Sequence, residues 1–245
     1  TYLMQIYQST KDWQQGIALK KVIVKTKDKR LLHTLANFYC ELATLALEKD
    51  EFIDVLELLE NALSYDPNSC RANWLMAQVY ENHEQYREAS QCYRDIYQQD
   101  KDFFPEVIEP MHACYCHQDI EEDFFTFIRK VYEETGSSSA LLKYLTHLES
   151  RYGVNKAKEF LLSALKRRPT IRGFKHFVKM QMTDSEDNHK SEGLDVIKEL
   201  ISAYLNMRPR YTCHTCGFNS STHYWSCPSC HGWEQLKPVR GLEGE

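Results

Sequence analysis

Long apolar runs are missing from this sequence, and with them the simplest sign of a membrane protein. No stretch approaches the roughly 18 uninterrupted apolar residues that a bilayer-spanning helix needs. The chain opens at Thr1 in a helical pattern and without a methionine, so a membrane anchor or targeting segment could precede it in the native protein. We expect the 245 residues themselves to be soluble.

Excess positive charge is also missing. Lys and Arg number 30 against 35 Asp and Glu, which gives a formal net charge of −5 and a pI near 6.1. Proteins that bind nucleic acids broadly carry a strong basic excess, so this balance weighs against that function. Catalytic signatures are lacking too, because no phosphate-binding loop, nucleophile elbow or pair of carboxylates stands out. The sequence therefore favours a protein without enzymatic activity.

Helix-breaking residues are scarce before residue 213. Glycine is rare there, and five of the seven prolines fall between periodic apolar stretches: Pro67, Pro105, Pro110, Pro169 and Pro209. The runs between them are rich in Leu, Ala, Glu, Lys and Gln, which favour helices, so strands have little room before residue 210. A last helix pair should span 171–207 around a polar loop, "TDSEDNHKSE" at 183–192. These features predict an all-α domain over residues 1–207.

The predicted helices repeat with a period of 34 residues. The matched apolar pairs are Leu42 with Met76, Ala43 with Ala77, Ala46 with Tyr80, Phe52 with Tyr86, Val55 with Ala89, Leu59 with Tyr93 and Ala62 with Ile96. A helical bundle needs amphipathic faces but no fixed period. This period resembles the tetratricopeptide repeat, in which a small residue at the crossing lets two antiparallel helices approach closely.

Weaker copies of the pattern flank these two repeats. The upstream marks are Leu3, Tyr7, Trp13, Gly16 and Ile23; the downstream marks are Met111, Tyr115, Phe124, Ile128 and Val131, then Leu145, Leu148, Ala157, Leu161, Ala164 and Pro169. We therefore expect a tetratricopeptide-repeat superhelix, whose first helices line a concave, partner-binding face. The repeat register points seven polar residues toward that face: Asn37, Thr44, Arg71, Gln78, Asn82, Glu109 and His117. Each of them could equally be an ordinary solvated residue.

The segment "CHTCGFNSSTHYWSCPSC" at 213–230 breaks the helical pattern. Its four cysteines form two Cys-x-x-Cys pairs with ten residues between them: Cys213, Cys216, Cys227 and Cys230. Four thiolates complete a tetrahedral metal site, and a structural zinc ion contributes about 10–16 kcal/mol to the folding of a small module. Residues 208–245 are too few to fold on an apolar core alone. The spacing predicts a structural site for one zinc or iron ion.

Disulfide bonds and thiol redox chemistry are the alternatives to a metal. The nine cysteines are odd in number, and five of them are scattered through helical segments, which favours a reducing, cytoplasmic compartment where disulfides are rare. His214, His223 and His231 lie close by, but four cysteines already complete the coordination. The aromatic residues of the module are expected to form a miniature core or to dock on the helices. In the second case the module would clamp the last helices of the array.

Two other functions remain open on the residues alone. An iron-loaded centre of this kind could transfer electrons, and colour would distinguish it from zinc. A zinc ribbon could bind nucleic acid, with some support from Arg208, Arg210, Lys237 and Arg240 beside aromatic residues.

Short stretches of the sequence resemble known proteins. The two cysteine pairs resemble the knuckles of rubredoxin, although the spacer between them is shorter and His231 stands where such knuckles often have glycine. The stretches "FYCELA", "RPRYTCHTCGF", "YWSCPSC" and "KPVRGLEG" are similar to the lipopolysaccharide assembly protein B family of Gram-negative bacteria. The resemblance runs over essentially the whole chain, which would be the larger, carboxy-terminal part of the family's cytoplasmic region.

The family resemblance implies a function that the residues by themselves do not. It implies an amino-terminal helix that anchors the protein in the inner membrane, with the repeats and metal module on the cytoplasmic side. It also implies an adaptor that works with the membrane protease FtsH to control turnover of LpxC, a deacetylase of the lipid A pathway. The same resemblance assigns the four cysteines as metal ligands. A homodimer is compatible with this reading.

Overall fold

The computed structural model describes residues 2–49, 52–184, 188–242 and 244–245. The chain divides into two compact units: Thr1–Asp119 with Trp225–Gln235, and Ile120–Tyr224 with Leu236–Glu245. Among the described residues, no helix combines the length and the apolar character that a bilayer crossing would require.

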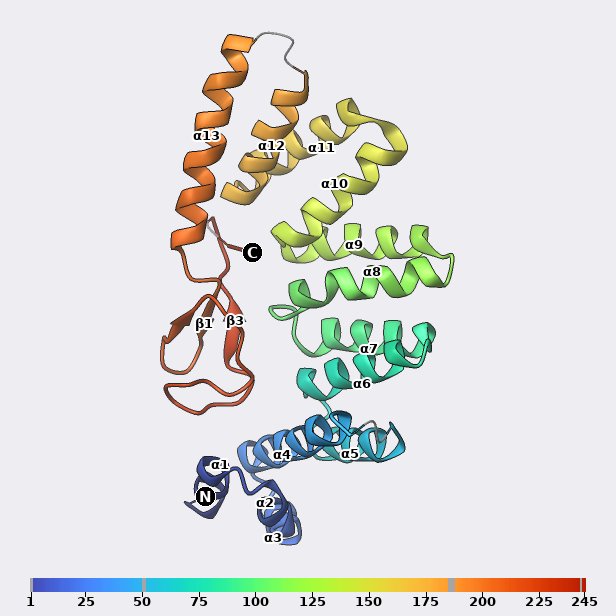
Figure 1. Ribbon diagram of the computed structural model, residues 1–245, viewed down its shortest axis with the longest axis vertical. Helices are drawn as coiled ribbons and strands as arrows, with labels where there is room; N and C mark the ends of the chain where they lie inside the picture. The colour runs from blue at the N-terminus through green and yellow to red at the C-terminus, as the bar shows by residue number, and fades with distance from the viewer. Residues whose placement is uncertain (1, 50–51, 185–187, 243) are drawn as a thin grey trace. The chain divides into compact units, whose positions relative to one another are not determined.

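The first unit is built from paired helices. Their bounds are α1 Tyr2–Thr10, α2 Trp13–Ala18, α3 Lys20–Thr26, α4 Lys29–Leu47, α5 Phe52–Tyr65, α6 Cys70–Asn82, α7 Tyr86–Gln99 and α8 Ile108–His117, with a 3₁₀ turn at Phe104–Val107. Helix α4 packs on α5 and α6 packs on α7, and Figure 1 shows each pair as two neighbouring antiparallel helices. This helix–turn–helix order is that of tetratricopeptide repeats.

Local sequence sets where the first helices of the two repeats begin. The Asp28 carboxylate accepts a 2.9 Å hydrogen bond from the Arg30 amide at the start of α4. The Ser69 hydroxyl accepts a 3.3 Å bond from the Ala72 amide at the start of α6. Such caps satisfy amides that have no partner inside the helix.

The 34-residue pattern marks the core of the first unit. Both members of four matched pairs are fully buried, namely Ala43 with Ala77, Val55 with Ala89, Leu59 with Tyr93, and Ala62 with Ile96. The predicted close approach upstream is also present, because a Cβ on Gly16 in α2 would stand 2.3 Å from the Phe38 ring of α4. Leu3, the first of the upstream marks, is 53% exposed and lies outside this core.

The second unit continues the helix pairs and ends in a small sheet. Its helices are α9 Glu121–Thr135, α10 Ser138–Tyr152, α11 Val154–Arg167, α12 Ile171–Asp184 and α13 Asn188–Met207, and its strands are β1 Tyr211–Cys213, β2 Asn219–Ser220 and β3 Leu236–Pro238. Strand β1 is central and pairs antiparallel with both β2 and β3. The all-α repeat fold with a small C-terminal ribbon is therefore confirmed. Helix α13 ends at Met207, next to the predicted start of the module at residue 208.

The predicted loop at 183–192 is longer than the structure allows. Helix α12 continues to Asp184 and α13 begins at Asn188. Residues 185–187 lie outside the described part of the chain. Polar composition misled the prediction, because the surface of a helix tolerates charged residues as well as a loop does.

Candidate metal centre

Each Cys-x-x-Cys pair lies in a tight turn closed by two backbone hydrogen bonds. In the first turn the Gly217 amide donates to the Cys213 carbonyl at 2.9 Å, and the Cys213 amide donates to the Phe218 carbonyl at 2.8 Å. In the second turn the His231 amide donates to the Cys227 carbonyl, and the Cys227 amide donates to the Gly232 carbonyl, both at 2.9 Å. The two turns therefore present their cysteines in the same way.

The four cysteines form a metal site of the zinc-ribbon type. The sulfur atoms of Cys213, Cys216, Cys227 and Cys230 all lie within 4.8 Å of one another. Ligands around a tetrahedral zinc ion with bonds of about 2.3 Å lie about 3.8 Å apart, so small adjustments would suffice to bind an ion. Sulfur donors suit zinc and iron alike. His214, His223 and His231 are not part of this cluster.

The residue that follows each Cys-x-x-Cys pair has a left-handed backbone conformation. Gly217 has a φ of +75° and His231 has a φ of +57°. A side chain with a Cβ is strained there by about 1–2 kcal/mol, which glycine avoids. The departure from the rubredoxin pattern at His231 thus has the small cost that the sequence predicts.

Substituting His231→Gly is expected to stabilise the metal site by about 1 kcal/mol, because glycine removes this strain. The measurement is the chelator concentration at which half of the metal is released, which should rise about fivefold. His214→Gly is the matched control, since His214 is also exposed but has no positive φ. Equal metal release from the native chain and the His231→Gly variant would contradict the strain argument.

Residues 225–235, which we call the docking segment, pack against the first repeats. The Trp225 ring lies 5.2 Å from that of Trp74 and 5.0 Å from that of Phe103. The Trp233 ring meets that of Trp13 edge-on at 6.2 Å. Aromatic pairs at such distances add to the free energy gained from their burial. Aromatic residues of this segment therefore dock on helices, as expected, but on the first repeats and not on the last helices of the array, where the clamp was predicted.

Arg71 of α6 lies between the two tryptophans of the docking segment. Its guanidinium carbon is 5.9 Å from the centre of the Trp225 ring and 5.4 Å from that of Trp233. Its Nη1 lies 2.9 Å from Glu41 Oε1, an ion pair whose angles fall short of a hydrogen bond. The side chain is almost fully buried, so Glu41 and the two aromatic rings stabilise its positive charge in place of water.

Glu234 attaches the docking segment to the start of α6. Its Oε2 accepts a 3.1 Å hydrogen bond from the Cys70 amide, and its Oε1 accepts bonds from Ser69 Oγ at 2.9 Å and Asn37 Nδ2 at 3.3 Å. The residue is 6% exposed. A carboxylate at a helix N-terminus satisfies unpaired amides and interacts favourably with the helix dipole.

Glu245 makes the equivalent attachment within the second unit. Its Oε2 accepts hydrogen bonds from Ser137 Oγ at 2.9 Å and from the Ser139 amide at 3.0 Å, at the start of α10. Its Oε1 lies 2.9 Å from Arg172 Nη1. In each unit, then, a glutamate of the C-terminal segment binds the start of a repeat helix that has a serine at its N-cap. No sequence motif marks either carboxylate, so neither contact was predictable from the sequence.

His33 links the docking segment to the first repeat. Its Nδ1 contacts Asp66 Oδ2 at 2.5 Å, and its Nε2 lies 3.3 Å from the Trp233 carbonyl oxygen. Burial alone would lower the pKa of His33, but the hydrogen bond with Asp66 and the nearby carboxylates of Glu234 and Asp66 outweigh it, so the pKa is raised. Burial likewise favours a raised pKa for Asp66, but its contacts with His33 and the Asn68 amide lower it.

The seven residues predicted for the concave face fall into two groups. Asn37 and Arg71 are buried under the docking segment and contact Glu234 and the two tryptophans. The other five are at least partly exposed: Thr44, Gln78, Asn82, Glu109 and His117. The first group is thus engaged by the protein's own chain. Partner binding by the second group stays a prediction.

Three of the cysteines outside the metal site are poor nucleophiles. Burial raises the pKa of both Cys40 and Cys92 to about 12. Burial and a hydrogen bond to Glu81 also raise the pKa of Cys114. These thiols stay protonated at neutral pH and behave as small apolar side chains.

The chain is similar in sequence to a metal-binding family and to several known proteins. A family model described as a rubredoxin metal binding domain matches residues 211–238. The chain is 32% identical to lipopolysaccharide assembly protein B of Escherichia coli K12 over 99% of this chain and 62% of that protein. It is 27% identical to the Haemophilus influenzae protein of the same name over 98% of this chain and 61% of that protein. The solved structure of YrrB, titled a TPR protein with an unusual peptide-binding site, covers 78% of this chain and 98% of its own, with 14% identity and a TM-score of 0.40.

Proposed function

The chain belongs to the lipopolysaccharide assembly protein B family, of whose Escherichia coli member it spans 62%, and from this premise we propose a non-catalytic adaptor in lipopolysaccharide synthesis. The adaptor holds the membrane protease FtsH and the deacetylase LpxC together and so controls how much LpxC the cell keeps. It acts at the cytoplasmic face of the inner membrane, where a segment preceding residue 1 anchors it.

One observation carries the adaptor proposal: the metal site is joined to the repeats through the docking segment. Four cysteines supply a full tetrahedral ligand set, which leaves no position for a substrate or an activated water. Trp225, Trp233 and Glu234 next to the site are used for packing and capping. An ion held in this way stabilises a binding surface and has no catalytic role.

The partner surface proposed here is the part of the repeat face that the docking segment leaves open. Thr44 in α4 and Gln78 and Asn82 in α6 lie on the first helices of two successive repeats, and all three are at least partly exposed. First helices of stacked repeats line the face that selects partners. Glu109 and His117 extend the same set to α8.

Site-specific crosslinking in cells tests the adaptor proposal. A photoreactive amino acid placed at Gln78 or Asn82 of the full-length protein is expected to crosslink to FtsH or LpxC, identified by mass spectrometry. Glu57, exposed on α5, is the matched position on a second helix and should give no such product. Equal crosslinking from Glu57, or an LpxC level that does not change when the gene is removed, would overturn the proposal.

The metal itself is proposed to be zinc or iron with a structural role. A zinc-loaded protein is colourless, whereas an iron centre with four thiolates absorbs visible light and bleaches on reduction. The acidic balance of the chain, with a formal net charge of −5, weighs against the nucleic-acid alternative.

A further inference from the structure

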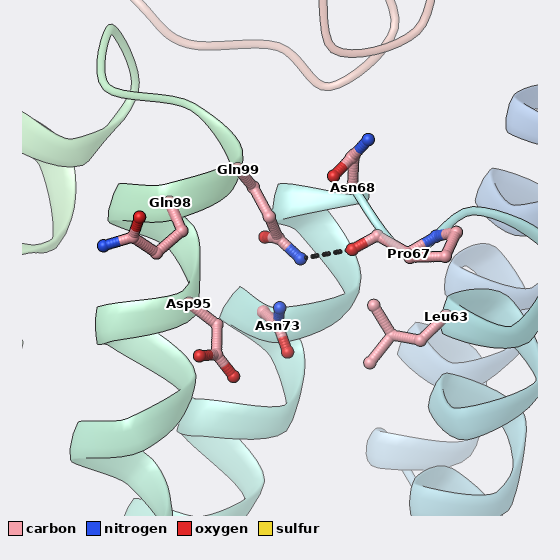
Figure 2. Close-up of a pocket in the computed structure, with 7 residues that line it drawn as sticks. All are labelled: Leu63, Pro67, Asn68, Asn73, Asp95, Gln98 and Gln99. Atoms are coloured by element: carbon pink, nitrogen blue, oxygen red, sulfur yellow. Dashed lines mark hydrogen bonds between the residues drawn. The ribbon is translucent and has the colours of Figure 1, made fainter.

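The first unit contains a pocket away from the metal site, between α5, α6 and α7. Its volume is about 390 Å³, and Figure 2 shows the side chains that line it. Leu63 and Pro67 form an apolar wall, and the remaining lining residues are polar. Helices α5 and α7 are the second helices of two successive repeats, and the first helix α6 contributes only Asn73 to the lining.

Asn73 offers this pocket a side-chain amide that makes no hydrogen bond to the described residues. The residue is 5% exposed and lines the pocket from α6. Its backbone amide donates to the Ser69 carbonyl at 3.4 Å, but none of the described residues bonds to its side-chain amide. Neither polar atom of the Asn73 carboxamide is among the fully buried unpaired atoms, so both reach the pocket, where a ligand can bond to them.

Two more acceptors of the pocket lack a full set of donors. The Gln99 side chain donates to the Pro67 carbonyl at 2.7 Å, as Figure 2 shows, which leaves its buried Oε1 without a partner. Asp95 Oδ1 accepts a 2.9 Å bond from Gln91, and no described cation pairs with this carboxylate. Figure 2 shows the Asp95 carboxylate extending from α7 toward α6, where the Asn73 amide lies.

This arrangement fits a cation with several donors in one plane. Asp95 is the sole charged residue among those that line the pocket. A guanidinium group offers five N–H donors in a fixed fork, which matches a carboxylate together with two amide oxygens. The methylene groups of an arginine would pack on Leu63 and Pro67. The donor side of the Asn73 amide would remain for a peptide carbonyl.

We propose that this pocket binds an arginine side chain presented by a peptide segment of a partner protein. Asp95 pairs with the guanidinium, Gln99 Oε1 and the Asn73 oxygen accept its remaining donors, and the Asn73 amide donates to the peptide backbone. This site would let the proposed adaptor recognise an arginine-containing peptide. The proposal depends on the adaptor role only in assigning that peptide to a partner protein. A synthetic peptide tests the site directly, so its failure would leave the adaptor proposal standing.

Titration of the 245-residue chain with acetyl-Gly-Arg-Gly-amide, followed by the side-chain amide signals of a ¹⁵N-labelled sample, tests the site. We expect saturable shifts of the Asn73 and Gln99 amide signals at millimolar peptide. Asp95→Asn should weaken binding about tenfold or more, because a charge-assisted hydrogen bond is lost. Glu88→Gln removes one charge from the same helix outside the pocket and should bind like the native chain.

The neutral isostere is the decisive control. Acetyl-Gly-citrulline-Gly-amide keeps the shape of the arginine side chain but lacks its charge, and it should produce no saturable shifts at the same concentrations. Equal binding of the citrulline peptide, unchanged binding by Asp95→Asn, or an absence of shifts with the arginine peptide would each overturn the proposal. Unchanged far-ultraviolet spectra of the variants show that a loss of binding is not a loss of fold.

Discussion

Replacing Cys227 and Cys230 by serine is expected to melt the docking segment and to lower the melting temperature of the first repeats by roughly 10 °C, because the metal and the packing that depends on it are lost together. A structural zinc ion contributes about 10–16 kcal/mol to small modules, far more than residues 225–235 could gain from their own packing. Without the ion, the contacts of Trp225 and Trp233 with Trp74 and Trp13 are lost.

Calorimetry of the native chain and the double variant measures this effect. Cys213→Ser with Cys216→Ser should give the same shift, because one ion needs all four sulfurs. Cys116→Ser is the matched control, since Cys116 is exposed and lies outside the four-cysteine cluster. A chelator should lower the transition of the native chain and leave that of the double variant unchanged. An unchanged helical transition in the variant would show that the metal supports the ribbon alone.

Glu234→Ala is expected to destabilise the first unit by about 3–5 kcal/mol while leaving metal binding intact. The substitution leaves the Cys70 amide, Ser69 Oγ and Asn37 Nδ2 without their acceptor. Hydrogen bonds to a charged group contribute about 1.5–3 kcal/mol each, and buried donors left unpaired are costly. Glu234→Gln should be less harmful, since an amide keeps one acceptor oxygen but brings two donors toward the Cys70 amide.

The measurement for Glu234 is the free energy of unfolding in urea, together with the metal content of the folded protein. Glu57→Ala on α5 is the control, because that glutamate is exposed and its loss should change stability by less than about 0.5 kcal/mol. A Glu234→Ala variant as stable as this control would show that the carboxylate contributes little. Loss of metal from the variant would show that metal binding depends on the hydrogen bonds that Glu234 accepts at the start of α6.

The repeat and the metal site were readable in the sequence because each depends on spacing. Ala43 with Ala77 and Leu59 with Tyr93 are separated by one repeat, and all four side chains are fully buried. The spacing of the cysteine pairs is equally informative, because a tight turn with two cysteines three positions apart brings their sulfur atoms close together. Short-range patterns of this kind survive in a single sequence.

The docking segment was only partly predictable because its contacts join residues far apart in the chain. Aromatic residues in the ribbon suggested docking, but nothing indicated that Asn37 and Arg71 would be covered by it. Glu234 has no motif, and it adopts a φ of +54° that glutamate rarely takes. Its role follows from the position of the α6 N-terminus, which only the folded chain provides. The same holds for Glu245 at α10.

The span of the Glu234 contacts has a consequence for how the protein is made. Cys70 and Glu234 are 164 residues apart, so a ribosome elongating at about 5–20 residues per second adds the glutamate roughly 8–33 s after the cysteine. During that interval the nascent repeats display Arg71 and the start of α6 without their cover. Newborn chains therefore offer chaperones and proteases a surface that the finished molecule hides.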